Sequence, residues 1–258
     1  MALPQGAKGD GHMKCIYADF RRAITGRWFL AAFLASMAAL YLSMGAQSYE
    51  LLNLLSQVST PEEDFQLDGS AMLLQALQGH FGMLVLPALS ALPFAGQALQ
   101  EMQCGAVRPV IFRVGRTPWI AGKWSATLAS GALVQLAAAM GFLLTLQLMM
   151  LCCAGTLCPL ADGGSLCFLL LRRMLCGGIW AGVGCLAALL TETSAAACFA
   201  PLCLCYAMMM IGTRFFPGIV QLNPVSWFTG RAWPLLLALA ALAAALNWML
   251  QRKVNAYA

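Results

Sequence analysis

Low-charge apolar stretches recur along the whole chain, and they constrain its fold more than any other feature. Apolar residues make up 61% of the 258 residues and charged residues only 10%, whereas soluble domains carry about a quarter charged residues. Each stretch is close to the length of about 20 helical residues that crosses a hydrocarbon core of roughly 30 Å. None alternates apolar and polar residues as barrel strands do. The stretches therefore predict membrane-spanning helices, which satisfy their own backbone hydrogen bonds in lipid.

Six stretches are long enough to cross, which predicts an all-α polytopic membrane protein with six transmembrane helices. They cover residues 28–46, 81–99, 124–153, 166–190, 195–211 and 232–250. Pro87 and Pro93 lie inside the second stretch, where proline removes a helix hydrogen bond and kinks the helix. We expect residues 13–258 to form a single transmembrane domain.

The segment before the first stretch predicts an amphipathic helix that lies in the membrane interface. Its apolar residues recur every four positions, which places them on one helix face. These residues are Ile16, Phe20, Ile24 and Trp28. A simple N-terminal extension of the first span is the alternative. Residues 1–12 are Gly-rich and polar, so we expect a disordered tail or cloning remnant, with Met13 as a candidate natural start.

Basic residues are distributed unevenly between the two sides that the spans define. With the N-terminus inside, the inner segments carry eleven of the fifteen basic residues: Lys8, Lys14, Arg21, Arg22, Arg27, Arg108, Arg113, Arg116, Lys123, Arg252 and Lys253. The outer four are Arg172, Arg173, Arg214 and Arg231. The positive-inside rule then predicts that both termini are cytoplasmic. Arg172 and Arg173 are expected near the start of the fourth span, where long side chains snorkel to the interface.

Signatures of enzymes and nucleic-acid-binding proteins are not found in the sequence. It has no H-E-x-x-H metal motif, no G-x-S-x-G elbow and no Walker phosphate loop. The net charge of +5 comes from residues at the ends of apolar runs, not from a block that would line a phosphate-binding groove. We therefore expect no catalytic residue, no cofactor and no nucleic-acid partner.

The eleven cysteines include no pair with C-x-x-C spacing, so no zinc ribbon or redox dithiol is indicated. Most lie inside apolar runs, where a free cysteine acts as a small hydrophobe. Four gather near one membrane face: Cys152, Cys153, Cys158 and Cys167. We expect no metal site among them, with a disulfide or a metal site as the alternative.

The segment between the second and third spans carries the most information. Its sequence is EMQCGAVRPVIFRVGRTPWIAGK. Glu101, Gly105 and Arg108 are spaced i, i+4 and i+7, so we expect them on one helix face, and we expect Pro109 to interrupt that helix. Gly105 is expected to permit close approach by another element, whose donor the Glu101 carboxylate would bind.

The second half of this segment predicts a short helix between two spans. It carries an apolar patch flanked by arginines: Ile111, Phe112, Arg113 and Arg116. Gly115 suits a helix C-terminus, and Thr117-Pro118 is typical of an N-cap and a first helical residue. Such a helix is suited to pass force from a soluble partner into the membrane bundle. An ordinary basic loop is the alternative.

These residues resemble the second inner region of permease subunits in the second-type ABC exporter family. There, a Glu at the end of span two precedes a Gly by four residues, followed by a short helix, an Arg-rich stretch and a Gly-Lys that leads into span three. The matching positions here are Glu101, Gly105, Arg113, Arg116, Gly122 and Lys123. The amphipathic N-terminal segment and the LNPVSWF motif before the last span add to the resemblance, which covers residues 13–253. One departure is that the acid-rich sequence before the Gly is reduced to Glu101.

The resemblance implies a permease subunit of an ATP-driven exporter in the bacterial cytoplasmic membrane. It implies a second permease subunit, as a homodimer or heterodimer, and a separate ATP-binding subunit that hydrolyses ATP. The implied coupling residues are Glu101, Gly105, Arg108, Ile111, Phe112, Arg113, Arg116 and Lys123. A secondary transporter or channel, or a non-transporting membrane assembly protein, are the alternatives. The sequence does not indicate the substrate.

Overall fold

The computed structural model describes most of the chain and is helical throughout this part. The described residues are 6–45, 69–154, 163–216, 218–219, 223–228 and 233–257. The segment between the first two expected spans carries acidic residues and no basic ones, and it lies largely outside the described residues, as do Met1–Gln5 and Cys158.

Five helices in the described part are long and apolar enough to cross a membrane. They are α2 (Arg27–Met44), α8 (Arg116–Ala154), α9 (Gly163–Thr191), α10 (Ala196–Arg214) and α11 (Trp233–Tyr257). A sixth crossing is present if the bent pair α4 (Gly69–Gln78) and α5 (His80–Ala91) counts as one span. The chain is therefore a multi-pass helical membrane protein with five or six candidate spans among the residues that the structure describes.

The second span differs from the expected single kinked helix over 81–99, because the helical residues fall into separate segments. α4 and α5 meet at 82°, and Pro93 lies in the turn between α5 and α6 (Gln97–Gln103). α2 packs against the break, where the Gly82 N–H donates to Ser43 Oγ at 3.4 Å. A Cβ on Gly79 would lie 2.0 Å from the same oxygen. The small residues at the break thus let α2 satisfy a backbone group that the bend frees.

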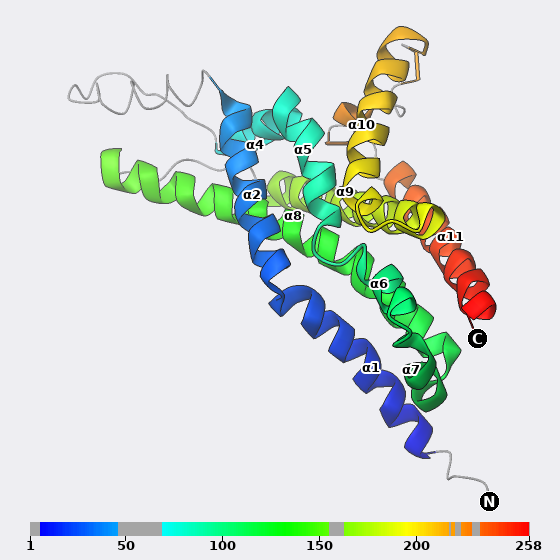
Figure 1. Ribbon diagram of the computed structural model, residues 1–258. Helices are drawn as coiled ribbons and strands as arrows, with labels where there is room; N and C mark the ends of the chain where they lie inside the picture. The colour runs from blue at the N-terminus through cyan, green and yellow to red at the C-terminus, as the bar shows by residue number, and fades with distance from the viewer. Residues whose placement is uncertain are drawn as a thin grey trace, which may run out of the picture.

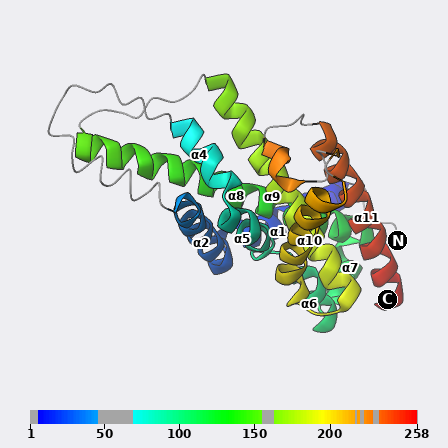
Figure 2. The same ribbon diagram turned by 90° about the horizontal axis from the view of Figure 1, so that it is seen from above.

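α9 lies at the centre of the bundle and packs against α5, α8, α10 and α11 (Figures 1 and 2). Its contact with α8 is a backbone contact, because a Cβ on Gly131 of α8 would lie 2.6 Å from the carbonyl oxygen of Gly177. Small residues permit this approach between membrane helices. The two helices form the core on which the others assemble.

α8 is longer than a bilayer core requires. Its 39 residues extend for roughly 60 Å at 1.5 Å per residue, and its end projects from the bundle on the side away from α11 (Figure 1). The helix begins at Arg116, so Thr117 and Pro118 lie inside its first turn. The prediction that they form the N-cap and first residue is wrong, because Gly115 already ends the preceding helix.

α1 (Gly6–Thr25) packs along the first part of α8. It begins at Gly6 rather than Met13, so part of the expected tail is helical. Trp28 belongs to α2, and both Ile24 and Trp28 are exposed, whereas Asp19 and Ala23 are buried. Ile16 and Phe20 of the predicted stripe are partly buried, and Phe20 packs against Ala23 and Phe94. The packed face of α1 thus overlaps the predicted apolar stripe only in part.

Several polar contacts tie the ends of separate helices together at one end of the bundle. Arg116 Nη1 donates to Asn255 Oδ1 at 3.1 Å, Gln103 Nε2 donates to the Glu192 carbonyl at 3.0 Å, and Lys253 pairs with Glu192. These contacts join α6, the start of α8, the α9–α10 turn and the end of α11. We call this region, with α1 and α7 (Val107–Val114), the α7 end.

Candidate functional site

A buried lysine joins three helices at the α7 end. Lys123 of α8 is 2% exposed. Its Nζ donates to Asp19 Oδ1 of α1 and to Glu101 Oε1 of α6, each at 2.7 Å. We call these three residues the Lys123 cluster. Because each side chain comes from a different helix, the cluster fixes α1 and α6 to the start of α8.

Two aromatic rings and a glycine surround the Lys123 cluster. Trp119 Nε1 donates to Glu101 Oε2 at 3.4 Å, and the Phe94 and Trp119 ring centroids lie 5.5 Å and 5.8 Å from Lys123 Nζ, within cation–π range. A Cβ on Gly122 would lie 3.1 Å from Asp19 Oδ2. Gly122 therefore permits the approach of α1 that brings Asp19 to the lysine.

The short helix between two spans is present as α7, which runs from Val107 to Val114. Val107 is buried, whereas Phe112 is 90% exposed and Arg113 is exposed. A hollow of about 470 Å³ lies beside the helix and reaches Val254 of α11. Its other lining residues are Val107, Arg108, Ile111, Phe112, Gly115 and Arg116. α7 thus packs on one side and presents an aromatic and basic face on the other.

The structure brings Glu101 and Lys123 together but separates Glu101 from Gly105 and Arg108. Gly105 has φ +70° in the turn between α6 and α7, so the three predicted residues do not share one helix face. A Cβ on Gly105 would meet nothing within 4 Å. The position favours glycine because of its left-handed backbone, and the prediction of a close approach there is wrong.

Pro109 does not interrupt a helix as predicted, because it lies in the first turn of α7. The backbone N–H that proline lacks would have no helical partner at that position. Gly115 ends α7 as predicted, with φ +96° and its N–H donating to the Ile111 carbonyl at 2.9 Å.

Asp19 is the member of the cluster that sequence reasoning missed. The four-residue apolar pattern places Asp19 on the polar face of the expected interfacial helix, yet its side chain is 6% exposed. One signal was available, since Asp19 is the only acidic residue between Asp10 and Glu50, and Arg21 and Arg22 follow it closely. A lone carboxylate in such a segment indicates an ion pair with a specific cation. That this cation is Lys123 follows only from the fold.

A second buried cation lies in the middle of the bundle. Arg173 of α9 is 4% exposed, and its Nη2 donates to Gln135 Oε1 of α8. It lies ten residues into α9, which is roughly 15 Å along the helix axis. The prediction that Arg173 snorkels at a span end is therefore wrong, because α9 begins before the expected boundary and carries the guanidinium inward.

Gln135 is held by α5. Its Nε2 donates to the Leu86 carbonyl at 2.9 Å and to Ser90 Oγ at 2.6 Å. Both amide hydrogens are thus used, which turns Oε1 toward Arg173. The network links the bent α5 to the two central helices.

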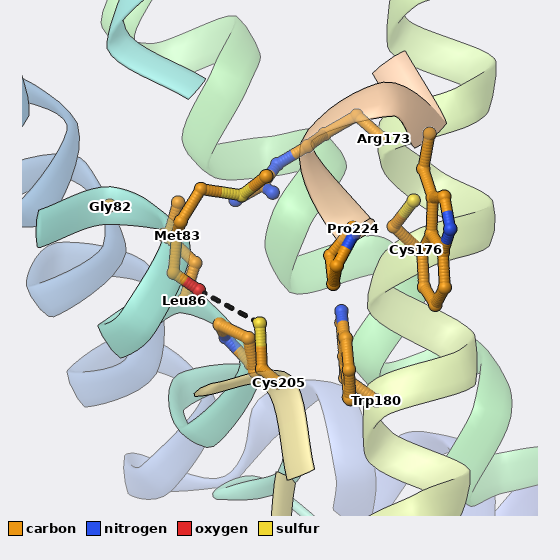
Figure 3. Close-up of a pocket in the computed structure, with 10 residues that line it drawn as sticks. Gly82, Met83, Leu86, Arg173, Cys176, Trp180, Cys205 and Pro224 are labelled. Carbon is orange, nitrogen blue, oxygen red and sulfur yellow. Dashed lines mark hydrogen bonds between the residues drawn. The ribbon is translucent and has the colours of Figure 1, made fainter. Parts of the chain in front are cut away.

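Arg173 lines a small pocket, which we call the Arg173 pocket (Figure 3). The lining residues come from α5, α9, α10 and the 3-10 helix η2 (Pro224–Phe228). They are Gly82, Met83, Leu86, Pro87, Arg173, Cys176, Trp180, Cys205, Pro224 and Trp227. The pocket has a volume of about 10 Å³, close to the space that one water molecule needs.

Two further contacts shape the pocket wall. Trp180 and Trp227 stack with ring centroids 5.6 Å apart. Cys205 Sγ donates to the Met83 carbonyl at 3.4 Å, because Pro87 lacks the N–H that would otherwise bond this carbonyl in a helix. The proline distortion of α5 is thus satisfied by α10.

The described residues contain no group of three His, Cys, Asp or Glu side chains that could hold a metal ion. Cys152 and Cys167 are free and exposed. The Cys153 side chain and Cys158 lie outside the described residues, so the predicted role of this cysteine group stays a prediction.

Comparisons with protein-family models, curated proteins and solved structures found no match to this chain. The two buried cations and α7 are therefore interpreted from their own geometry, within a multi-pass helical membrane protein.

Proposed function

We propose that this chain is the permease subunit of an ATP-driven exporter in the bacterial cytoplasmic membrane. In this proposal it has six spans, with α4 and α5 as one broken span, and both termini are cytoplasmic. It pairs with a second permease subunit and with a separate ATP-binding subunit, which hydrolyses ATP. The resemblance around Glu101 and Lys123 motivates the proposal, and the exposed face of α7 is the observation that carries it.

The position of α7 supports a coupling role. The helix leads through Gly115 directly into α8, and the Lys123 cluster ties α8 to α1 and α6. A displacement of α7 would therefore move the start of a long span together with two other helices. ATP binding to the partner would supply the difference in affinity that shifts the bundle between inward-open and outward-open states.

The charge distribution supports the orientation. Arg113, Arg116 and Lys253 lie at the α7 end, and the burial of Arg173 removes one of the four residues counted as outer basic residues. Eleven basic residues then lie in the inner segments and three in the outer segments. The positive-inside rule favours a cytoplasmic α7 end on this count.

The test is copurification and ATPase coupling with an ATP-binding subunit encoded by a neighbouring gene. Phe112→Ala removes the most exposed aromatic side chain of α7, and it should weaken partner binding about tenfold or more if Phe112 anchors the contact. Glu101→Ala should leave insertion and abundance near normal while it reduces substrate-stimulated ATP hydrolysis about tenfold.

The matched control is Phe215→Ala, because Phe215 is also exposed, at 72%, but follows α10 at the other end of the bundle. It should leave both partner binding and ATP hydrolysis unchanged. Equal effects of the two phenylalanine substitutions, or substrate flux by the chain alone, would contradict the proposal.

A secondary transporter or channel is the second candidate, and the burial of Arg173 inside the bundle favours it, since intramembrane charge often marks a transport pathway. Flux measured in proteoliposomes that contain only this chain, without ATP, distinguishes the two. A membrane assembly protein would show no substrate-dependent flux under either condition.

A further inference from the structure

α1 has a packed face and an exposed face. Asp19 and Ala23 are buried against the bundle, whereas Tyr17 is 69% exposed and Ile24 is exposed too. Arg21 lies between these two residues in the sequence and is also exposed. Because Tyr17, Arg21 and Ile24 are spaced i, i+4 and i+7, they share one side of the helix. In Figure 1, α1 runs along the outer edge of the molecule.

The exposed surface continues past Gly26 into the first residues of α2. Arg27 and Trp28 are both exposed, and the Arg27 guanidinium lies 5.8 Å from the Trp28 ring centroid, within cation–π range. α2 is long and apolar enough to cross a membrane, so these two residues lie where a candidate span begins. We call the exposed side chains of this region the α1 surface: Tyr17, Arg21, Ile24, Arg27 and Trp28.

The positive charge of the α1 surface is not neutralised within the part of the chain that the structure describes. Every acidic side chain in this part forms a salt bridge with a lysine, and two of them, Asp19 and Glu101, belong to the Lys123 cluster. No salt bridge among the described residues involves Arg21 or Arg27. An anion that pairs with these arginines therefore comes from outside the described residues.

The residue types of the α1 surface favour a phospholipid as the source of this anion. Tyrosine and tryptophan are enriched at the membrane–water interface, because one end of each side chain is apolar and the other is polar. Basic residues beside a span attract anionic headgroups, and the planar guanidinium of arginine matches the oxygens of a phosphate. Because the surface adjoins a candidate span, both kinds of side chain lie at the level of the headgroups.

We propose that the α1 surface binds anionic phospholipids, with Arg21 and Arg27 at the phosphates and Tyr17, Ile24 and Trp28 against the adjoining acyl chains. The sequence predicts only that this segment lies in the interface. The fold adds selectivity for lipid charge, because Asp19 is turned into the Lys123 cluster and leaves cations on the exposed side. Lipid binding needs no ATP-binding subunit, so this proposal does not depend on the coupling role of α7.

The test measures which lipid contacts Trp28 in nanodiscs that contain equal amounts of phosphatidylglycerol and phosphatidylcholine. Brominated acyl chains quench tryptophan fluorescence on contact. The bromines are placed on one of the two lipids at a time, so the surface charge of the disc stays constant. The contribution of Trp28 is the difference between the wild-type chain and the Trp28→Phe variant. Phosphatidylglycerol should occupy this contact at least about threefold more often than phosphatidylcholine.

Two double variants separate the charge of the arginines from their shape. Arg21→Gln with Arg27→Gln should lower the preference for phosphatidylglycerol below about 1.5-fold, whereas Arg21→Lys with Arg27→Lys should keep most of it, because either cation attracts an anionic headgroup. The wild-type chain provides a measurement that needs no variant at these positions. Its preference should weaken when the salt concentration rises from about 0.05 M to about 0.5 M, because salt screens exposed charges.

Arg214→Gln is the matched control, because Arg214 is also an exposed arginine but lies at the end of α10. It should leave the preference at Trp28 unchanged. Equal quenching by the two brominated lipids would overturn the proposal, as would an unchanged preference in the double glutamine variant or an equal loss in Arg214→Gln. Absence of Trp28 quenching by either lipid would also overturn it, since another molecule would then cover the α1 surface.

Discussion

Lys123 and Arg173 are both nearly inaccessible cations in one helical bundle, but their contacts with neighbouring helices differ. Lys123 bonds two carboxylates that come from separate helices, whereas Arg173 bonds a neutral amide whose orientation α5 sets. Opposite charges on three helices make the Lys123 cluster a joint between them. The contact of Arg173 instead joins α9 to α8 through an amide that α5 holds in place.

The largest expected effect comes from removing Lys123. Lys123→Met leaves the buried Asp19 carboxylate and the partly buried Glu101 carboxylate side by side, and breaking a buried ion pair in this way costs about 3–5 kcal/mol. Thermal unfolding in detergent, followed by helix content, measures the loss. The control is Lys253→Met, since the Lys253–Glu192 pair is much more exposed and exposed pairs contribute little to stability. Similar losses of thermal stability in both variants would show that the buried Lys123 cluster contributes no more than the exposed pair.

A smaller effect is expected from the neutral partner of Arg173. Gln135→Leu removes one acceptor of a charged donor and frees Ser90 and Leu86, which should cost about 1.5–3 kcal/mol. The same unfolding measurement applies, with the exposed Gln100→Leu as control. Equal stability of Gln135→Leu and Gln100→Leu would show that the contacts of Gln135 contribute nothing.

The smallest effect belongs to the exposed Glu192–Lys253 pair. The hydrogen bond from Lys253 holds the pKa of Glu192 below its usual value. A carboxylate with a lowered pKa in the folded state adds stability above its unfolded pKa, and this contribution is lost as the pH falls through the folded value. The wild-type unfolding temperature should thus fall slightly more than that of Glu192→Gln between about pH 5 and pH 3. Parallel curves for the two proteins would show that the pair contributes nothing.

The sequence predicted the straight spans well because hydrophobic length is a local property. The stretches around α8, α9, α10 and α11 are apolar for long enough to cross a bilayer regardless of their neighbours. The short helix α7 was indicated by Gly115, which ends it. Orientation, partners and the coupling role of α7 stay predictions, because they concern molecules outside this chain.

The parts that the sequence did not predict depend on tertiary neighbours. Arg173 was judged by its distance from a span boundary, yet its burial follows from the packing of α9 between four helices. The sequence pattern places Asp19 on a polar helix face, yet it is buried because Gly122 of another helix leaves room for its carboxylate. The α4–α5 bend required Ser43 to satisfy Gly82, a pairing that no local pattern contains.

The bond between Cys205 and the Met83 carbonyl has a consequence for biogenesis. The two residues are 122 positions apart, so α5 leaves the ribosome long before its partner in α10 exists. Until α10 is inserted, the carbonyl that Pro87 frees has no N–H donor in its own helix, and an unsatisfied backbone group in lipid costs several kcal/mol. The hydrogen bonding of α5 is therefore completed only after α10 has been inserted beside it.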